Sequence, residues 1–318
     1  MEICWNLTHC CPFSCKICMV NPVNVNDDNK LIIRSRLEKS GKCLTHYDKI
    51  KIIKEIASSF GKVKIDFAGG DPLLFKEDFE IIKLASNFFG AENIEISATG
   101  YPINKKILNF LKDKVSKLDF TLDTVFPRLE SSRGDRYSKI NTKAIILTRK
   151  KGLEVTVSTV LKKDNIDKKN LNEIYHFLLK NRIANWHLMR FRPLGRGSKY
   201  KSLMPSEKEY KEALNYCLSL KRKNGPIINI HHTFYNLMNI MSKNKACKIG
   251  NKFTILSDGT VISCCWAFNR WGRPLDDKFV LGKLPQDNLE EIIKSDKLKK
   301  IKKIPACRVD YFLNNTKK

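Results

Sequence analysis

The chain has 318 residues, 42% of them hydrophobic, and its 59 Lys and Arg residues against 33 Asp and Glu give a formal net charge of +26. This composition excludes a disordered chain and provides for one large domain, or one domain with a substantial appendage. The sequence lacks the features of a secretory signal, and its longest charge-free apolar stretch, residues 233–242, is too short to span a membrane. We therefore expect a cytoplasmic protein with no membrane partner. The positive charge would attract anions such as nucleic acid, but lysines on polar helix faces explain it equally well.

Short β-type runs alternate with helical patterns from the start of the chain. A strand at 3–7 precedes a polar loop and then a helix, which Thr45 and Asp48 open as a capping box. In chain order, the pattern then predicts strands at 63–67, 94–98, 118–122, 155–160 and 187–191, and helices at 79–89, 107–115, 137–150 and 171–179. These six β/α units predict the α/β class, with a partial (β/α)6 TIM-like barrel over residues 1–195. The chemistry of such a barrel lies at the carboxyl ends of its parallel strands.

The pattern changes after residue 195. Residues 196–245 are expected to form a linker and a helical bridge, whose helix starts with a capping box of Ser206 and Glu209. From residue 246 to 318, short strands at 253–256 and 261–263 are joined by a turn that contains Gly259. We expect a second, smaller domain there, made of a β-hairpin and helices.

Eleven cysteines in a chain without an export signal indicate metal ligands or catalysts rather than disulfides. Cys11, Cys15 and Cys18 directly follow the first strand, and their spacing suits an iron-sulfur cluster. Three ligands leave one iron of a four-iron cluster open. A zinc site would need a fourth ligand, which His9 or Cys10 could provide, so both kinds of metal site stay open.

The stretch Asn6-Leu7-Thr8, followed by Cys11, Cys15 and Cys18, resembles the signature of radical SAM enzymes. The resemblance implies that the three cysteines hold a 4Fe-4S cluster whose open iron binds S-adenosyl-L-methionine (SAM). It also implies reductive cleavage of SAM to a 5′-deoxyadenosyl radical, which abstracts a hydrogen atom from the substrate. Ile17 lies where many members have an aromatic residue, and we still expect it to contact the adenine.

A second motif, at residues 66–72, resembles the GGEP motif that ends the second strand in this family, with Asp71 in place of glutamate. The resemblance implies that Gly69 and Gly70 let the backbone approach the methionyl part of SAM, while Asp71 suits its ammonium group. Later strands contribute four further expected SAM contacts: Ser97, Thr99, Ser158 and Met189. Residues 190–196 resemble the end of the family's sixth strand, and their three arginines either bind an anionic group or face solvent.

The second set of cysteines resembles the SPASM or shorter twitch extension of radical SAM enzymes. The resemblance implies one auxiliary 4Fe-4S cluster, with Cys247, Cys264 and Cys307 as ligands. Its fourth position is taken by Asp310 or by Cys265, or is open to substrate. Cys265 is also the candidate catalytic residue, because radical SAM peptide epimerases return a hydrogen atom from a cysteine thiol. Alternatively Cys265 is a small buried residue, or it exchanges roles with Cys264.

These features predict a radical SAM enzyme that modifies a ribosomally synthesised peptide by epimerisation or crosslinking, with flavodoxin or ferredoxin as electron donor. One alternative is a small-molecule dehydrogenase or epimerase acting on a sugar or aminoglycoside. A nucleic-acid-modifying enzyme is not favoured, because no RNA-binding module is recognised. The alternative from a different functional class is a non-catalytic iron-sulfur or zinc protein that binds nucleic acid as a sensor. Outside these sites, Cys4 and Cys217 are expected to pack in the core.

Overall fold

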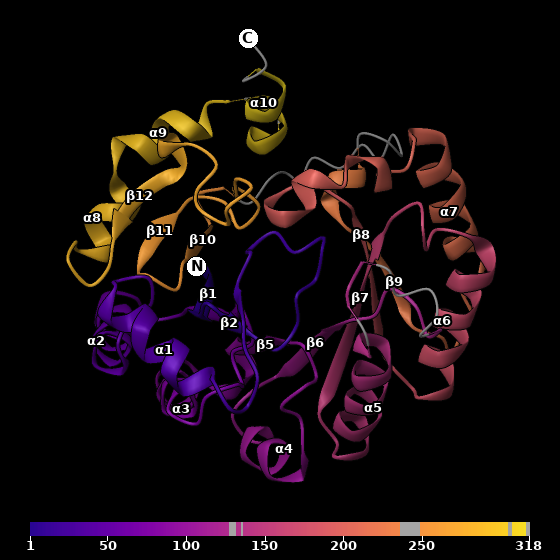
Figure 1. The fold of residues 1–318 in the computed structure, drawn as a ribbon, viewed down its shortest axis with the longest axis horizontal. Helices are drawn as coiled ribbons and strands as arrows, with labels where there is room; N and C mark the ends of the chain where they lie inside the picture. Colours follow the sequence, from indigo (N-terminus) through magenta and orange to yellow (C-terminus); the bar gives the residue numbers. More distant parts are fainter. Residues whose placement is uncertain (127–131, 135, 236–248, 305–306, 316–318) are drawn as a thin grey trace.

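The computed structural model describes residues 1–126, 132–134, 136–235, 249–304 and 307–315, and the side chains of 313–315 are not part of that description. Its centre is a ten-stranded sheet with the strand order β12-β11-β10-β1-β4-β5-β6-β7-β8-β9. The sheet curves, and helices α1 to α6 lie on its outer side (Figure 1). Within the described residues the two end strands, β12 and β9, do not pair, so the barrel is open.

Six parallel strands form the predicted partial barrel. Their bounds are β1 Glu2–Thr8, β4 Lys64–Gly69, β5 Ile94–Ala98, β6 Lys117–Thr121, β7 Glu154–Leu161 and β8 Asn185–Arg190. The helices that follow the early strands are α1 Lys30–Lys39, α2 His46–Ser59, α3 Asp78–Phe89, α4 Lys105–Leu111, α5 Tyr137–Lys150 and α6 Lys168–Lys180. The predicted α/β class with a partial (β/α)6 barrel is thus confirmed.

The outer face of the sheet is apolar and the inner face is polar. Ile3, Trp5 and Leu7 of β1 are buried in the main core, whereas Cys4 between them lies outside that core. Because side chains alternate along a strand, Cys4 and Asn6 point to the opposite, inner face. The same alternation repeats on the other strands, so the core lies between sheet and helices and polar groups are left for the inner face. Cys217, expected in the core, is fully buried there.

Capping boxes in the local sequence determine where two helices, α2 and α7, begin. The Thr45 side chain accepts a hydrogen bond from the Asp48 backbone and the Asp48 side chain accepts one from Thr45, which completes the predicted capping box of α2. Ser206 and Glu209 form the same box at the start of α7, Glu207–Ser219. Each box satisfies backbone N–H groups that have no partner inside the helix.

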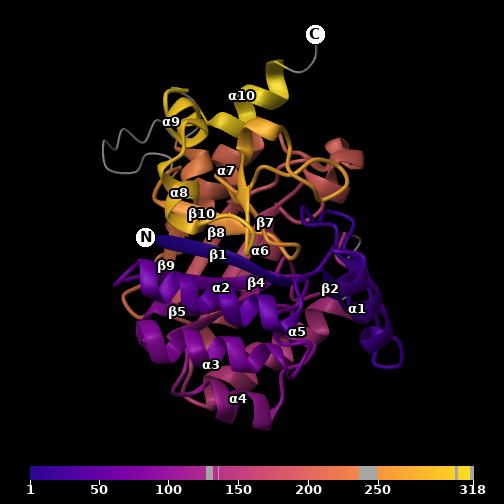
Figure 2. The same ribbon diagram turned by 90° about the vertical axis from the view of Figure 1, so that its left-hand side faces the viewer.

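The C-terminal part adds to the same sheet rather than forming a separate layer. Strand β10, Lys252–Ile255, pairs in parallel with β1, and β11, Thr260–Ile262, and β12, Val280–Lys283, follow it antiparallel. Helices α8 Leu289–Lys294, α9 Asp296–Lys302 and α10 Arg308–Asn315 gather at one end of the molecule, opposite α3 and α4 (Figure 2). At the other edge β9, Ile227–Ile230, pairs in parallel with β8. The sequence pattern did not predict β9, β12, or helix α1 in the long polar loop.

In the part of the chain that the structure describes, every helix is too short or too polar to traverse a lipid bilayer.

Candidate functional site

The cysteine loop that follows β1 is closed at its base by two short strands. Strand β2, Cys10–Cys11, pairs in parallel with β3, Val23–Asn24. The Val23 N–H donates to the His9 carbonyl at 2.7 Å, and the Val25 N–H donates to the Cys11 carbonyl at 3.0 Å. The intervening residues therefore form a closed loop at the carboxyl end of β1, where a barrel places its chemistry.

This loop brings the three predicted ligands together. Cys11, Cys15 and Cys18 belong to one contact cluster, which also contains the rings of Phe13 and Tyr137. The two ring centroids lie 4.8 Å apart in an edge-to-face arrangement. The Phe13 N–H points to the Cys11 sulfur at 3.5 Å, a contact that favours the thiolate. Three soft sulfur donors beside an aromatic wall fit an iron-sulfur cluster.

Burial controls the protonation of these thiols. It raises the pKa of Cys11 well above its ordinary value and the pKa of Cys15 to about 11. The guanidinium of Arg133 acts in the opposite direction on Cys15, since it lies beside the sulfur and favours the thiolate. Because only thiolates bind iron, cluster assembly has to release these protons.

Cys10 does not join the other three cysteines. It packs in a separate apolar cluster with Val25, Leu37, Cys43 and other residues. Within the described residues, no three His, Cys, Asp or Glu side chains converge closely enough for a single metal ion. The placement of Cys10 gives no support to the zinc site in which it would be the fourth ligand.

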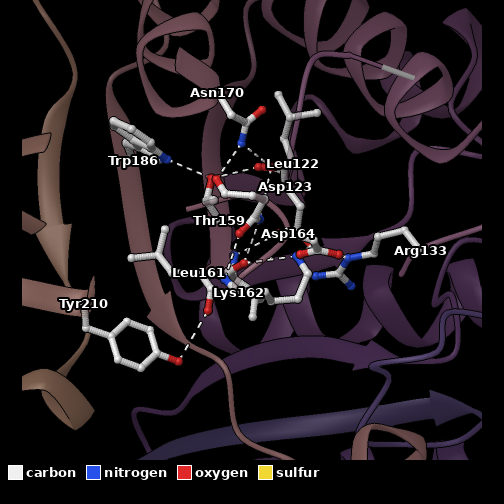
Figure 3. A network of polar contacts seen from close by, with 12 residues as sticks. Leu122, Asp123, Arg133, Thr159, Leu161, Lys162, Asp164, Asn170, Trp186 and Tyr210 are labelled. Atoms are coloured by element: carbon white, nitrogen blue, oxygen red, sulfur yellow. Dashed lines mark hydrogen bonds and ion pairs between the residues drawn. The ribbon is translucent and has the colours of Figure 1, made fainter. Parts of the chain in front are cut away.

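A buried ion network supports the loop from the ends of β6 and β7 (Figure 3). The Asp123 carboxylate accepts a hydrogen bond from Arg133 Nε at 2.8 Å and one from Lys162 Nζ at 3.0 Å. It also accepts the Val160 N–H at 2.9 Å. Although burial opposes ionisation, the two cations and these hydrogen bonds lower the pKa of Asp123 to about 2. Asp123 thereby fixes Arg133, which reaches Cys15.

The end of β8 packs directly on the cysteine loop. Arg196 donates to Ser14 Oγ at 2.9 Å and to the Pro22 carbonyl at 2.8 Å, and its backbone N–H donates to the Cys18 carbonyl at 2.9 Å. Gly195 has a φ of +54°, and a Cβ there would lie 2.2 Å from the Met19 carbonyl oxygen. Only glycine allows this approach. The other two arginines of the segment also contact protein groups: Arg190 lies over the Tyr210 ring and Arg192 contacts Cys307.

The predicted GGEP-like turn, at residues 69–71, holds the loop from the other side. A Cβ on Gly70 would lie 1.9 Å from the Cys10 carbonyl oxygen, and one on Gly69 would lie 2.7 Å from the Thr8 carbonyl oxygen. The N–H groups of Gly70 and Asp71 donate to Thr8 and Cys10 carbonyls, both at 2.9 Å. The glycines are therefore required for close packing of this turn on the chain after β1, whether or not they also contact SAM.

Asp71 lies inside the protein. Its carboxylate is fully buried and accepts the Leu73 N–H at 2.9 Å, the Thr99 N–H at 3.2 Å and a short hydrogen bond from the Thr99 hydroxyl. Burial raises its pKa despite these bonds. In this arrangement Asp71 joins the ends of β4 and β5, and direct contact of Asp71 or Thr99 with SAM stays a prediction.

Two serines expected to contact SAM donate hydrogen bonds to aspartates on the inner face. Ser97 Oγ donates to Asp66 at 3.0 Å, and Ser158 Oγ lies 2.9 and 3.1 Å from the two oxygens of Asp119. Burial and the nearby Asp66 raise the pKa of Asp119 to about 7, against the opposing effect of the Ser158 hydroxyl. Of the other expected contacts, Ile17 is buried and Met189 is half-buried on β8. SAM contact by Ser97, Ser158, Ile17 and Met189 is likewise still a prediction.

The second set of cysteines meets the barrel through Arg192. Arg192 Nη2 lies 3.1 Å from Cys307 Sγ and also forms a short ion pair with Asp310. Cys264 and Cys307 both pack against the main core as half-buried residues. Cys247 lies outside the described residues. Asp310, a candidate fourth ligand, is occupied by Arg192 in this arrangement, and the ligand set stays a prediction.

Cys265 lies near charged groups of the inner face. Burial lowers the pKa of Lys252 on β10, but the negative charges of Cys265, Cys4 and Asp66 raise it. The net effect is a raised pKa. Cys4 is only half-buried and burial raises its pKa, with smaller contributions from Asp66 and Cys265. The prediction that Cys4 packs in the apolar core is wrong, because strand alternation turns it to the inner face.

Sequence reasoning missed Arg133 entirely, and it singled out Arg192 only as one of three arginines, without its contact to Cys307. Arg133 depends on Asp123, and Arg192 lies 115 positions before Cys307. No spacing rule connects such distant positions. The one available signal was the cluster of arginines at the end of the sixth barrel strand.

Two family models match the chain. One, described as Radical SAM superfamily, matches residues 5–178, and another, SPASM, described as an iron-sulfur cluster-binding domain, matches residues 247–310. A curated protein named GTP 3′,8-cyclase, from Clostridium perfringens (strain SM101), is 26% identical over 303 residues, which cover 91% of this chain and 87% of that protein.

Solved structures with low sequence identity share the fold. Streptococcus suis SuiB bound to its precursor peptide SuiA has a TM-score of 0.72 at 14% identity, covering 93% of this chain. The match spans 65% of SuiB, slightly less than two thirds of its length. Native anSMEcpe with bound AdoMet and a Cp18Cys peptide has a TM-score of 0.67 at 17% identity, covering 94% of this chain and 81% of that one.

Proposed function

Because the chain belongs to the Radical SAM superfamily and carries an iron-sulfur cluster-binding domain, we propose that it cleaves SAM reductively and abstracts a hydrogen atom from a peptide. The observation that carries this proposal is the convergence of Cys11, Cys15 and Cys18 on the loop after β1. When bound, the cluster and SAM supply a 5′-deoxyadenosyl radical. Everything else depends on how the chain's own side chains hold and surround them.

The described residues divide this work between ligands and supports. The thiolates of Cys11, Cys15 and Cys18 would hold the cluster and leave one iron for SAM. Arg133 compensates negative charge at Cys15 and is itself fixed by Asp123. Arg196 ties the cysteine loop to the end of β8, which limits its movement when the cluster binds. A positioned site of this kind keeps the reacting groups aligned.

A ribosomally made peptide is the substrate class we propose, with epimerisation or crosslinking as the outcome. Two structures that share the fold, SuiB and anSMEcpe, contain bound peptides. The inner face offers hydrogen-bonding groups for a peptide backbone, including Asp66, Ser97 and Asp119. A mixed donor and acceptor surface is what an extended peptide requires, since each residue brings one N–H and one C=O group.

A nucleotide is the second candidate substrate. The observation in its favour is the curated relative named GTP 3′,8-cyclase, whose similarity extends over 91% of this chain. Incubation of the reduced enzyme with GTP and SAM tests it directly, since a GTP-dependent increase in 5′-deoxyadenosine and loss of GTP would replace the peptide proposal.

Cys265 is the proposed hydrogen donor if the outcome is epimerisation. The radical takes one hydrogen atom from a peptide Cα, and the Cys265 thiol returns one from the other face. The sulfur radical left on Cys265 then needs one electron and one proton, which the electron donor and solvent provide. In deuterated buffer the product should carry one deuterium, and Cys265→Ala should abolish epimerisation but not SAM cleavage. A product without deuterium, or an active Cys265→Ala enzyme, would refute this role.

The function itself is tested by paired cysteine variants. Anaerobically reconstituted wild-type protein should bind iron for two clusters and form 5′-deoxyadenosine with dithionite and SAM. Cys11→Ala should lose the iron of one cluster and all SAM cleavage. Cys10→Ala is the matched control, because Cys10 is the neighbouring residue but packs in a separate apolar cluster. Zinc in place of iron, or equal effects of the two variants, would refute the assignment.

A further inference from the structure

A cavity of about 400 Å³ opens between α9, α10 and the short helix at Asp277–Phe279. Three apolar side chains form its floor: Ile301 and Phe312 are buried, and Ile304 is half-buried. Three lysines and one aspartate line its rim: Lys278, Lys297, Lys300 and Asp277. An apolar hollow with a basic rim has the form of a docking site for an acidic partner rather than of a site for a neutral metabolite.

Lys278 lies over the Phe312 ring, with its Nζ 5.3 Å from the ring centroid, whereas the other two rim lysines are available for a partner. Six lysines and three acidic residues lie between positions 289 and 303. Two of these lysines, Lys294 and Lys299, form ion pairs with carboxylates of the same helices. Lys297 and Lys300 are exposed, and the structure gives them no ion pair with a described residue. Their charge therefore projects from the surface beside the apolar floor.

Helix α10 links the cavity to Cys307. Cys307 immediately precedes α10, the helix that provides Phe312 to the floor. Arg308 donates to the Ile301 carbonyl at 3.2 Å and to the Lys302 carbonyl at 2.8 Å, which fixes the start of α10 to the end of α9. On its other side Cys307 meets Arg192 at the end of β8. A partner in the cavity would thus contact α10, the helix that begins next to Cys307.

We propose that this cavity, with Lys297 and Lys300, is the docking site for a small acidic electron carrier of the flavodoxin type. The proposal rests on the function above, in which Cys307 holds an auxiliary cluster and SAM cleavage consumes electrons. One electron would pass from the flavin hydroquinone of the carrier, which becomes the semiquinone, to the auxiliary cluster, and no covalent bond would form or break. Redox partners use small interfaces steered by opposite charges, which a basic rim around one apolar hollow can provide.

Reduction by flavodoxin can be separated from the rest of the reaction. The test uses holoenzyme, a purified acidic flavodoxin reduced to the hydroquinone, and anaerobic stopped-flow absorbance of the clusters. In the double variant Lys297→Glu/Lys300→Glu, the second-order rate constant should fall by about tenfold or more at low ionic strength. The difference should shrink at about 0.5 M salt, because salt screens exposed charges. SAM cleavage driven by dithionite, which needs no docking, should be unchanged.

The matched control is Lys208→Glu/Lys211→Glu in α7. It reverses the charge of two exposed lysines that have the same spacing on a different helix. It should leave reduction by flavodoxin close to the wild-type rate. Equal slowing in both double variants would mean that only the overall charge matters, and would overturn the proposal. A wild-type rate in the Lys297/Lys300 variant would also overturn it. Loss of dithionite-driven peptide turnover in that variant alone would assign the cavity to the substrate instead.

Failure of the docking site can be distinguished from failure of the proposed function. If the wild-type holoenzyme cleaves no SAM with dithionite, the proposed function is wrong. If it cleaves SAM with dithionite and receives electrons from flavodoxin independently of Lys297 and Lys300, only the docking site is wrong.

Discussion

The Asp123→Asn substitution removes the negative charge from the network at the ends of β6 and β7 (Figure 3). Arg133 connects this network to Cys15. The carboxylate is 3% exposed and compensates two cations, Arg133 at 2.8 Å and Lys162 at 3.0 Å. Lys162 is itself 1% exposed. With asparagine in place, Arg133 loses this carboxylate, and buried Lys162 keeps only the more distant Asp164, at 3.6 Å.

The expected loss follows from this burial. Removing one partner of a buried ion pair costs about 3–5 kcal/mol, because the remaining charge is left unpaired in a medium of low dielectric constant. The lowered pKa gives a consistent figure. A carboxyl group with a pKa of about 2 when folded and about 3.9 when unfolded contributes about 2.6 kcal/mol at neutral pH. That contribution is present above the unfolded pKa and is lost as the pH falls from about 5 through 2.

Urea unfolding of the cluster-free protein, followed by tryptophan fluorescence, measures the effect. Trp186 is a suitable reporter, since its Nε1–H donates to Thr159 Oγ1 at 2.9 Å within the same region. The double variant Asp123→Asn/Lys162→Met should recover part of the loss, because it removes one of the two buried cations that lose the Asp123 charge. The exposed Asp296→Asn is the control and should show no measurable change. A loss below about 1 kcal/mol for Asp123→Asn would refute the reasoning, since that is the size of a surface ion pair.

Three further predictions concern the turn, the inner face and the auxiliary cluster. Gly70→Ala should reduce the iron bound after reconstitution and lower the urea midpoint, because its Cβ would lie 1.9 Å from the Cys10 carbonyl oxygen. Gly61→Ala, where no atom lies within 4 Å, should do neither, and equal behaviour of the two would contradict the steric explanation. Asp119 has a folded pKa of about 7, above the unfolded value of about 3.9, so its ionisation destabilises the fold as the pH rises from about 4 to 7. Asp119→Asn should therefore raise the free energy of unfolding at pH 8 and have little effect at pH 4, and a pH-independent effect would be inconsistent with the raised pKa. Arg192→Gln removes a charge-assisted hydrogen bond to a proposed ligand sulfur, worth about 1.5–3 kcal/mol, and should lower the midpoint potential of the auxiliary cluster by roughly 60–130 mV in an anaerobic titration followed by electron paramagnetic resonance. An unchanged potential would show that the contact is only structural.

The barrel was predictable because its signals are local. Each parallel strand is a short apolar run, each helix repeats its apolar residues at helical spacing, and the capping boxes at Thr45 and Ser206 mark two starts. Strand β9 gives a weaker signal, since all of its residues are half-buried or exposed. The pairing of β10 with β1 joins residues about 250 positions apart, which no local pattern can indicate.

The candidate site also has a part that local sequence predicts and a part that it does not. The three cysteines after β1 lie within eight positions, so spacing alone predicted their convergence. The expected roles of Gly69, Gly70 and Asp71 came from a family motif, and the structure adds a packing reason that the motif does not contain. The supports, Arg133 and Arg192, meet their partners only after the chain has folded, so tertiary contacts were needed to find them.

The position of β1 between β4 and β10 has a consequence for synthesis of the chain. β1 is translated before both of its partners, and β4 can pair with one of its edges after about 60 more residues. The other edge has no partner until Lys252 and the residues after it have been translated. Throughout that interval the nascent barrel carries an open strand edge, which is a hazard for aggregation and a target for chaperones.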